Sequence, residues 1–361
     1  MSKSVSTIAI TLIATAALTI AAGCSTAAAP PVSGGSSSGS TTSAQPATPD
    51  PKADWPKEFI VGYFGGDDPS AQLEKQEAWR AHLEKELGIP VKAITGTSYT
   101  AVIEAMAAKK ADAMEVGPFS YILAVQEAKA EALVATVSAT DQKKPKYDPA
   151  QLPYYYSVII TKKGSGVRTI ADLKGKGFSF VDPASTSGHL MPKTYLVKMG
   201  LDPDKDMTTV FAGSHPTSVI AVANGKTPAG ATYEGNLNLM IAQEQADVFW
   251  YPDGQFNKKR TEEELLKIYD QATDGKIVII GQTDPIPNTP FAVRSDLPAS
   301  FKAAVKAALM SDPANAERLS TSKKWYVDPS KELGLSTLDQ FYNPLRDVAK
   351  LLNLDLKELG G

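Results

Sequence analysis

The chain has 361 residues, a formal net charge of −3 and 21% charged residues. It lacks the basic excess of a nucleic-acid-binding protein, so we expect no nucleic-acid partner. Cys24 is the only cysteine and there are three histidines. This composition rules out an intrachain disulfide and argues against a cysteine or histidine metal centre, and we expect no metal and no other cofactor.

The first 23 residues have the pattern of a secretory signal peptide. Lys3 gives a basic start, residues 8–21 are apolar, and small residues precede Cys24. Small residues before a single cysteine are typical of a bacterial lipobox, in which the cysteine carries lipid and becomes the mature N-terminus. The alternative is a transmembrane anchor, because the apolar stretch is only slightly shorter than a membrane span. We favour a lipoprotein with its lipid on Cys24.

Residues 24–54, beginning with that cysteine, are predicted to form a disordered tether. They are rich in Ala, Pro, Gly, Ser and Thr and have no apolar periodicity. Such a segment cannot bury enough surface to offset the entropy of ordering it. A flexible spacer behind a lipid anchor would keep a folded domain on the outer face of the cytoplasmic membrane or in the periplasm.

Strands and helices are predicted to alternate from Trp55 onward, with a turn at 285–288. The strands are expected at 59–64, 91–94, 113–117, 133–138, 154–162, 178–182, 207–213, 229–233, 276–283 and 290–297. The helices are expected at 71–87, 99–108, 120–130, 170–173, 190–199, 217–224, 258–272 and over most of the chain from Ser300. This alternation predicts an α/β fold with a mainly parallel sheet.

Residues 154–162 and 290–294 are candidate crossings between two lobes. A chain that leaves one lobe, builds a second and returns leaves a ligand cleft between them. The predicted domains are lobe 1 at 55–157 plus 291–361, and lobe 2 at 158–290.

The stretch at 178–195, FSFVDPASTSGHLMPKTY, is the most informative about chemistry. A buried strand is expected to end at Asp182, three hydroxyl residues follow at 185–187, and a helix begins near Leu190. The unpaired N–H groups and positive dipole at a helix N-terminus, beside small hydroxyl side chains, can hold an oxyanion. The alternative is ordinary helix capping by Ser and Thr.

Two further segments place polar residues directly after strands. His215 follows the strand at 207–213, where its ring could donate to an anion or could be structural. Glu234 follows the strand at 229–233 and is either a surface acid or a carboxylate that lines a cleft.

These segments together resemble the phosphonate-binding proteins of bacterial ABC importers, a type II-like periplasmic binding protein family. The similar stretches are DPASTSGHLMP at 182–192, AGSHPTSVIAVANGK at 212–226, ATYEGN at 231–236, GTSYTAVIEAM at 96–106 and DPIPNTPFAVR at 284–294. The resemblance covers roughly residues 57–356. It implies two α/β lobes joined by two hinge crossings, with the ligand in the cleft between them.

The resemblance also implies a set of ligand contacts. The hydroxyl and N–H groups at 185–187 would hold the phosphonyl oxygens, and His215 would donate to them. Tyrosines would close over the ligand, with Tyr154 and Tyr156 as rivals to Tyr155. Glu234 would face the distal end of the ligand, with Tyr233 as its rival. The implied ligand-binding residues are Tyr99, Tyr155, Ser185, Thr186, Ser187, His215, Glu234 and Thr289.

Thr289 stands where we expect an acidic residue in a binder of aminoalkylphosphonates. A buried ammonium group without charge partners is costly. The sequence therefore predicts a preference for methylphosphonate or phosphite over 2-aminoethylphosphonate. Asp284 is an alternative source of the missing charge.

The predicted function is that of a monomeric substrate-binding lipoprotein of an ABC importer. It would capture a phosphonate-type oxyanion, such as a phosphonate, methylphosphonate or phosphite, and deliver it to a permease in the membrane. We expect no enzyme activity, because the GxSxG pattern of a nucleophile elbow is absent. A ligand sensor that serves a membrane signalling protein would use the same site, and a catalytic relative of the same fold is a further alternative.

Overall fold

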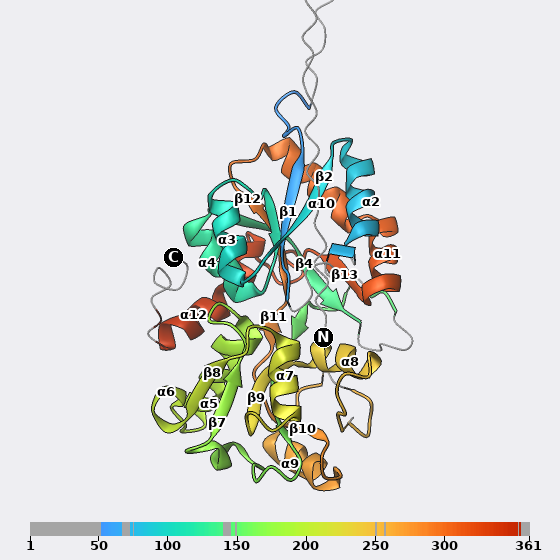
Figure 1. The fold of residues 1–361 in the computed structure, drawn as a ribbon. Helices are drawn as coiled ribbons and strands as arrows, with labels where there is room; N and C mark the ends of the chain where they lie inside the picture. The colour runs from blue at the N-terminus through green and yellow to red at the C-terminus, as the bar shows by residue number, and fades with distance from the viewer. Residues whose placement is uncertain are drawn as a thin grey trace, which may run out of the picture. The chain divides into compact units, whose positions relative to one another are not determined.

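The computed structural model describes residues 52–352 and 354, apart from gaps at 67–72, 75, 140–145, 149, 250 and 256–257 (Figure 1). All of the described residues belong to one compact unit that spans Pro49–Gly361. The predicted signal peptide, the lipidated Cys24 and all but the last three residues of the predicted tether lie outside them. Within the described part, no helix combines the length and the apolar character that a bilayer span requires.

Lobe 1 is built on a six-stranded sheet with the order β13-β4-β12-β3-β1-β2. Its strands are β1 (Phe59–Phe64), β2 (Val91–Gly96), β3 (Ala113–Glu115), β4 (Ala130–Ser138), β12 (Pro290–Arg294) and β13 (Lys324–Val327). β1 runs parallel to β2 and β3. β12 is antiparallel to β3 and β4, and β13 is antiparallel to β4.

Helices cover the sheet of lobe 1 and enclose two hydrophobic cores. The helices are α2 (Glu77–Leu87), α3 (Tyr99–Ala107), α4 (Pro118–Glu127), α10 (Ala299–Met310), α11 (Asp312–Ser322), η3 (Leu338–Tyr342) and α12 (Asn343–Leu351). Val102, Ile122 and Leu345 bring α3, α4 and α12 into one core. Leu83 and Phe301 bring α2 and α10 into the other. These buried apolar side chains recur at helical spacing, which is why the segments are amphipathic helices.

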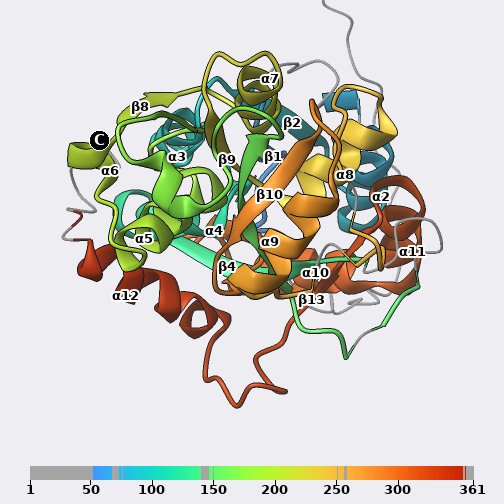
Figure 2. The same cartoon turned by 90° about the horizontal axis from the view of Figure 1, so that it is seen from below.

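Lobe 2 is built on a five-stranded sheet with the order β10-β6-β9-β7-β8. Its strands are β6 (Ser157–Lys162), β7 (Gly177–Phe180), β8 (Thr208–Phe211), β9 (Ala229–Tyr233) and β10 (Ile277–Gln282). Its helices are η1 (Ile170–Leu173), η2 (Thr186–Leu190), α5 (Met191–Lys198), α6 (Pro203–Asp206), α7 (His215–Ala223), α8 (Glu234–Ala242) and α9 (Glu262–Gln271). Leu196 of α5 and Leu237 of α8 belong to separate cores, and the two helices lie on opposite sides of the strands (Figure 2).

The two sheets are mixed, so the prediction of a mainly parallel sheet is wrong. β7 is parallel to β8 and β9, but β6 is antiparallel to β9 and β10. β6 and β12 each enter their sheet directly from the other lobe. Without a helical crossover from a neighbouring strand, nothing imposes the parallel arrangement of a βαβ unit on them.

The two chain segments that join the sheets are paired with each other. β5 (Tyr154–Tyr155) and β11 (Ile286–Pro287) form a short antiparallel ladder, with Ile286 opposite Tyr155. The predicted strand at 154–162 is therefore interrupted at Tyr156, and the predicted turn at 285–288 contains a short strand. Both connections run side by side between the lobes.

Candidate ligand-binding site

The segment between β7 and α5 contacts both lobes. A π-helical turn, η2, precedes α5, so the helix predicted from Leu190 begins one turn earlier. The Ser185 hydroxyl accepts the N–H of Gly188 at 3.0 Å. A Cβ atom on Gly188 would lie 2.3 Å from the Cβ of Val181. Glycine is therefore required here because the turn packs directly against the strand end.

The backbone amides of this turn differ in their availability. The N–H of Ser185 donates to the Asp182 carbonyl at 2.9 Å, so the protein itself satisfies this amide. This corrects the expectation that all three amides face a ligand. Thr186 and Ser187 are the first residues of η2, where N–H groups have no acceptor inside the helix. Among the described residues no partner is recorded for these two amides.

The same turn is tied to both lobes by its side chains and carbonyls. The Thr186 hydroxyl accepts the N–H of Phe119, in the first turn of α4, at 2.8 Å. The Ser187 carbonyl accepts the hydroxyl of Ser157, at the start of β6, at 2.6 Å. All three hydroxyl residues at 185–187 are at most 3% exposed. We refer to residues 185–187 as the hydroxyl loop.

Two buried tyrosines, Tyr99 and Tyr155, share a core with Ala184, the residue directly before the hydroxyl loop. Burial raises the pKa of Tyr99, and a hydrogen bond with the Ser185 side chain acts against that rise. Burial also raises the pKa of Tyr155, and hydrogen bonds with the Ser187 and Thr186 side chains act in the opposite direction. Both phenols are therefore neutral at physiological pH and can donate to an anion.

Burial distinguishes Tyr155 from Tyr154 as the tyrosine that could contact a ligand. Tyr155 is 9% exposed, whereas Tyr154 is 36% exposed and packs against Phe341 with ring centroids 5.3 Å apart. Tyr155 meets the ring of Tyr233 edge-on at 5.9 Å. Strand alternation places neighbouring side chains on opposite faces, which explains why Tyr155 alone of β5 turns inward.

His215 is buried beside this cluster as a neutral ring. It is the first residue of α7, and its ring meets Tyr233 edge-on with centroids 4.8 Å apart. Burial lowers the pKa of His215 to about 3. Its Nδ1 lies 3.3 Å from the hydroxyl of Thr232, which accepts a hydrogen bond from the Asn236 amide. If Thr232 donates to Nδ1, the histidine carries its own proton on Nε2, where it can donate.

Glu234 begins α8 and directs its carboxylate at the crossing segment. The two carboxylate oxygens accept the N–H of Tyr156 at 2.9 and 3.1 Å. Burial raises the pKa of Glu234 to about 8, and hydrogen bonds from the backbone of Tyr156 and of Glu234 itself act against that rise. Tyr233, the alternative to Glu234 as a ligand contact, is the preceding residue. Burial raises the pKa of Tyr233 to about 12, and the Glu234 charge adds a smaller contribution to that rise.

Among the described residues, no hydrogen bond or ion pair joins Thr289 or Asp284 to the other predicted site residues. Thr289 follows β11 and is half-buried, and its carbonyl accepts the N–H of Thr136 at 2.8 Å. Asp284 is exposed, and its carboxylate pairs with Lys198 at 3.0 Å. This surface ion pair corrects the alternative in which Asp284 replaces an inward-facing acid.

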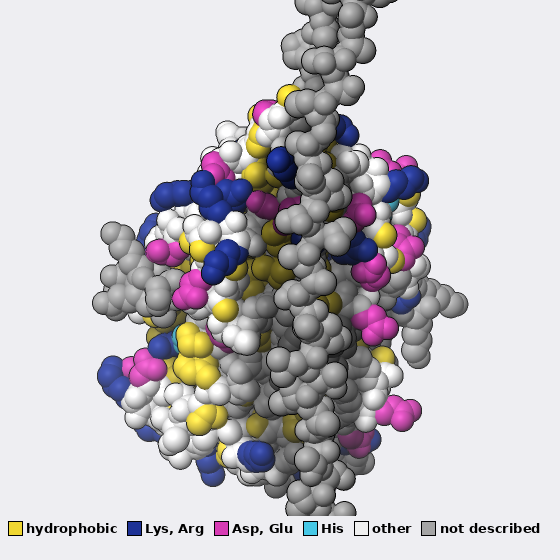
Figure 3. All heavy atoms as spheres, turned by 45° about the horizontal axis from the view of Figure 1, so that its top comes forward, with side chains coloured by type: hydrophobic (Ala, Val, Ile, Leu, Met, Phe, Trp, Pro, Cys, Tyr) yellow, Lys and Arg dark blue, Asp and Glu magenta, His cyan; other side chains and the backbone are white. Residues whose placement is uncertain are grey.

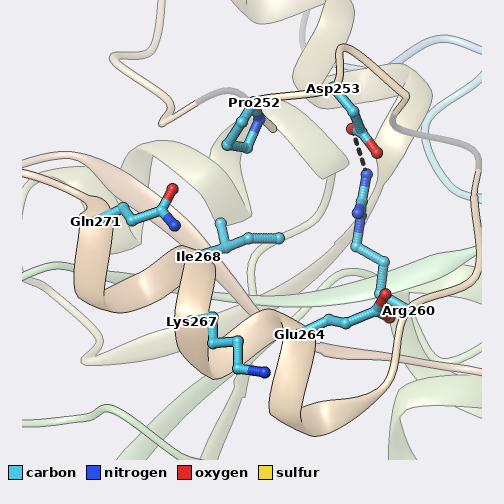
Figure 4. Close-up of a pocket in the computed structure, with 7 residues that line it drawn as sticks. All are labelled: Pro252, Asp253, Arg260, Glu264, Lys267, Ile268 and Gln271. Carbon is cyan, nitrogen blue, oxygen red and sulfur yellow. Dashed lines mark hydrogen bonds and ion pairs between the residues drawn. The ribbon is translucent and has the colours of Figure 1, made fainter.

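A hollow in lobe 2 is lined by other residues (Figure 4). It lies along α9 and contains Arg260, which pairs with Asp253 at 2.6 Å and lies over the Tyr251 ring. None of the predicted site residues lines it. Acidic and basic side chains both occur over the face seen in Figure 3, without a continuous field of one sign. In the part of the chain that is described, no group of three or more His, Cys, Asp or Glu residues could hold a metal.

Asp182 belongs to the cluster, but sequence reasoning treated it only as the end of a strand. It is 8% exposed, and its carboxylate accepts the N–H of Ala184 at 2.8 Å. Burial raises the pKa of Asp182, and the backbone of Ala184 and of Tyr99 acts against that rise. Its position directly before Pro183, three residues ahead of the hydroxyl loop, was the available signal.

The fold is that of a type II periplasmic binding protein, as the resemblance implied. One similar structure is the binding protein component of an ABC phosphonate transporter from Pseudomonas aeruginosa, with a TM-score of 0.58, 24% identity, and coverage of 84% of this chain and 91% of that one. Another is PhnD1 from Prochlorococcus marinus in complex with methylphosphonate, with a TM-score of 0.60, 18% identity, and coverage of 82% and 98%.

Residues 61–333 match the family model described as "ABC transporter, phosphonate, periplasmic substrate-binding protein", and the chain belongs to this family. The phosphate-import protein PhnD of Mycolicibacterium smegmatis is 33% identical over 161 residues, which cover 42% of this chain and 47% of the relative. The phosphonates-binding periplasmic protein of Escherichia coli is 31% identical over 185 residues, covering 49% and 52%. The chain spans about half the length of these two curated relatives.

Proposed function

We propose that the protein is the substrate-binding component of an ABC importer and captures a phosphorus oxyanion between its two lobes. The observation that carries this proposal is that Tyr99 of lobe 1 and Tyr155 of the crossing are buried in one core with Ala184 of lobe 2, the residue directly before the hydroxyl loop. Lobe 1 would comprise residues 55–157 and 291–361, and lobe 2 residues 158–290.

The site would hold its anion with neutral donors. In this proposal the anion would be held by the hydroxyls of Ser185, Thr186 and Ser187, the two phenols, an Nε2–H group of His215 and the amides at 186 and 187. None of these groups carries a positive charge. Hydrogen bonds to an ionised acceptor are about twice as strong as neutral ones, and a helix N-terminus adds a favourable dipole. Such a site can bind an oxyanion without a counter-cation.

Within this class we propose a ligand without a cationic tail, such as methylphosphonate or phosphite. Thr289 supplies no carboxylate, and the carboxylate of Asp284 is engaged by Lys198 at the surface. The carboxylate of Glu234 is bound by the Tyr156 amide. An ammonium group would therefore lack a dedicated partner and would lose solvation without compensation. Phosphate is the competing ligand, because the M. smegmatis relative is named a phosphate-import protein.

Calorimetric titration tests this proposal directly. Phosphite, methylphosphonate, 2-aminoethylphosphonate, phosphate and sulfate would be titrated into the folded domain from residue 52 onward. We expect phosphite or methylphosphonate to bind at least about tenfold more tightly than 2-aminoethylphosphonate, because a buried group without partners costs about 1–3 kcal/mol. Tighter binding of the amino compound would contradict the ligand preference. A lack of heat with every phosphorus oxyanion would contradict the function.

We further propose that Cys24 carries the lipid anchor after residues 1–23 are removed. The protein would then act as a monomer on the outer face of the cytoplasmic membrane or in the periplasm, beside a permease. Labelling of cells with an alkyne fatty acid tests the anchor, with Cys24→Ser as the comparison. We expect label and membrane association in the wild type and neither in the variant. Equal membrane association of the two proteins would refute lipid anchoring.

A further inference from the structure

Asn288 is the point where both crossings meet the C-terminal part of the chain. It follows β11 on the second crossing and is 6% exposed. Its N–H donates to the carbonyl of Pro153, which directly precedes β5 on the first crossing, at 2.7 Å. Its own carbonyl accepts the hydroxyl of Tyr342, the last residue of η3, at 3.0 Å. One buried residue therefore joins the two crossings to each other and to η3.

A ring contact adds a second link between η3 and the first crossing. Phe341 is 4% exposed, and its ring centroid lies 5.3 Å from that of Tyr154. Tyr342 is fully buried, in the same core as Tyr155 and Ile286, the residues that pair β5 with β11. A buried phenol needs a hydrogen-bond partner, and here the partner is a carbonyl of the second crossing. We refer to these contacts of Tyr342 and Phe341 with the crossings as the crossing brace.

η3 is itself fixed to the body of lobe 1. The hydroxyl of Tyr121, on α4, donates to the Asp339 carboxylate at 2.7 Å. Arg346 of α12 donates to the same carboxylate oxygen at 2.6 Å. The rings of Tyr121 and Tyr342 also pack together, with centroids 5.0 Å apart. The crossing brace therefore connects both crossings to the helices of lobe 1.

We propose that Tyr342 is a positioning residue for ligand capture, which holds both crossings against lobe 1 and so limits the separation of the lobes. Without its hydroxyl, the Asn288 carbonyl loses a buried donor and the crossings are held less firmly. A ligand that contacts both lobes binds more tightly when they are already close, because less of the protein population must shift on binding. The effect on affinity rests on the proposed function, whereas the effect on lobe separation does not.

Distances between the lobes, measured by double electron–electron resonance, test the crossing brace. Spin labels would be attached at Lys85→Cys in lobe 1 and at Lys226→Cys in lobe 2, which are both exposed positions. Cys24→Ser removes the only cysteine of the natural chain, so that labelling is confined to these two sites.

Two substitutions of the same kind are compared in this labelled chain. Tyr342→Phe removes the hydroxyl of the crossing brace and keeps the ring. Tyr326→Phe is the matched control, because Tyr326 is also buried in lobe 1 and its hydroxyl donates within that lobe, to Glu115 at 2.5 Å. A general loss of packing or hydrogen bonding in lobe 1 would affect both variants.

Without ligand, we expect the distance distribution of Tyr342→Phe to be broader than that of the wild type and to extend to longer distances. Tyr326→Phe should give the wild-type distribution. Saturating methylphosphonate should narrow the distribution of Tyr342→Phe. The affinity of this variant for methylphosphonate should fall by about twofold to tenfold, the effect of one buried neutral hydrogen bond, with no such fall in Tyr326→Phe.

The outcomes separate the crossing brace from the proposed function. If Tyr342→Phe and Tyr326→Phe give the same distance distribution, the role of Tyr342 is refuted. If the wild type binds no oxyanion, the proposed function fails, while the ligand-free distances still decide the role of Tyr342. If Tyr342→Phe does not fold, Phe341→Leu serves instead, because it removes the ring that packs on Tyr154 and should broaden the distribution in the same way.

Discussion

Both carboxylate oxygens of Glu234 accept a hydrogen bond from the backbone N–H of Tyr156. Glu234 starts α8 in lobe 2, and Tyr156 separates β5 from β6 on the first crossing. Tyr155, which is buried in one core with Ala184, is the residue directly before this contact. The carboxylate therefore anchors the crossing beside the candidate site, a role that differs from contact with the distal end of a ligand.

Replacement of Glu234 distinguishes these two roles. We expect Glu234→Ala to weaken methylphosphonate and 2-aminoethylphosphonate binding by a similar factor, because the anchor of the crossing is lost. Glu234→Gln should restore most of the affinity, since its oxygen can still accept the Tyr156 amide. Calorimetry with both ligands is the measurement. A loss confined to the amino compound would show that Glu234 contacts the ligand instead.

The same carboxyl group makes stability depend on pH. Burial raises the pKa of Glu234 to about 8, above the value of 4.5 for an unperturbed glutamate. The folded state therefore binds more protons than the unfolded state between these values. The resulting stabilisation is complete below about pH 4.5 and is lost as the pH rises through 8, at no more than about 1.4 kcal/mol per pH unit.

Chemical denaturation of the wild type and Glu234→Gln from pH 5 to pH 9 measures this dependence. As the pH rises, the free energy of unfolding of Glu234→Gln should increase relative to that of the wild type. A difference that stays constant across this range would contradict a raised pKa for Glu234.

Tyr155 and Tyr154 form a matched pair for testing the site. Tyr155→Phe removes the phenol hydroxyl but keeps the ring that packs on Tyr233. We expect oxyanion affinity to fall by about 10-fold to 150-fold, because a hydrogen bond to a charged acceptor contributes about 1.5–3 kcal/mol. Tyr154→Phe, which alters the exposed neighbour, should leave the affinity unchanged. If titration shows equal effects for the two substitutions, the prediction that Tyr155 contacts the ligand is refuted.

His215 is expected to act as a neutral donor. Its pKa of about 3 keeps it uncharged throughout the physiological range, so affinity between pH 5 and 8 should not follow its titration. His215→Leu should weaken binding by about tenfold or more through loss of one donor to an anion, and His215→Gln should recover part of the loss. An NMR titration of the ring that gives a pKa near 6.5 would contradict this prediction.

Gly188 should tolerate no side chain. An added Cβ would lie 2.3 Å from the Cβ of Val181, whereas at Gly177 the nearest atom would be 3.3 Å away. We expect Gly188→Ala to lower the free energy of unfolding by about 1–3 kcal/mol through overpacking and to weaken oxyanion binding by displacing η2. Gly177→Ala should have a smaller effect on both. Thermal unfolding and titration provide the comparison.

Local patterns predict much of this fold because most of its elements carry their own signals. β1, α3 and β9 match their expected bounds to within a residue, since apolar periodicity and flanking turn residues mark them. α8 was not predicted, because it follows β9 without a turn between them. β13 was not predicted either. It occupies four residues, Lys324–Val327, between helical segments, and it pairs with the distant strand β4.

The grouping of the site residues follows from where strands end. The segments directly after β7, β8 and β9 supply the hydroxyl loop, His215 and Glu234 at one edge of the lobe 2 sheet. The contacts that connect the lobes could not be foreseen in the same way. The bond from the Phe119 N–H to the Thr186 hydroxyl spans distant parts of the chain and depends on the orientation of a backbone amide, which no residue pattern specifies.

The ladder between β5 and β11 turns the two connections into one ribbon. A two-stranded ribbon bends readily out of its own plane but resists shear within it, because sliding would break the bonds that pair Tyr155 with Ile286. We therefore expect the lobes to move by bending of this ribbon more readily than by sliding along it. The angle between the lobes would then be the quantity that ligand capture changes and that a downstream protein could sense.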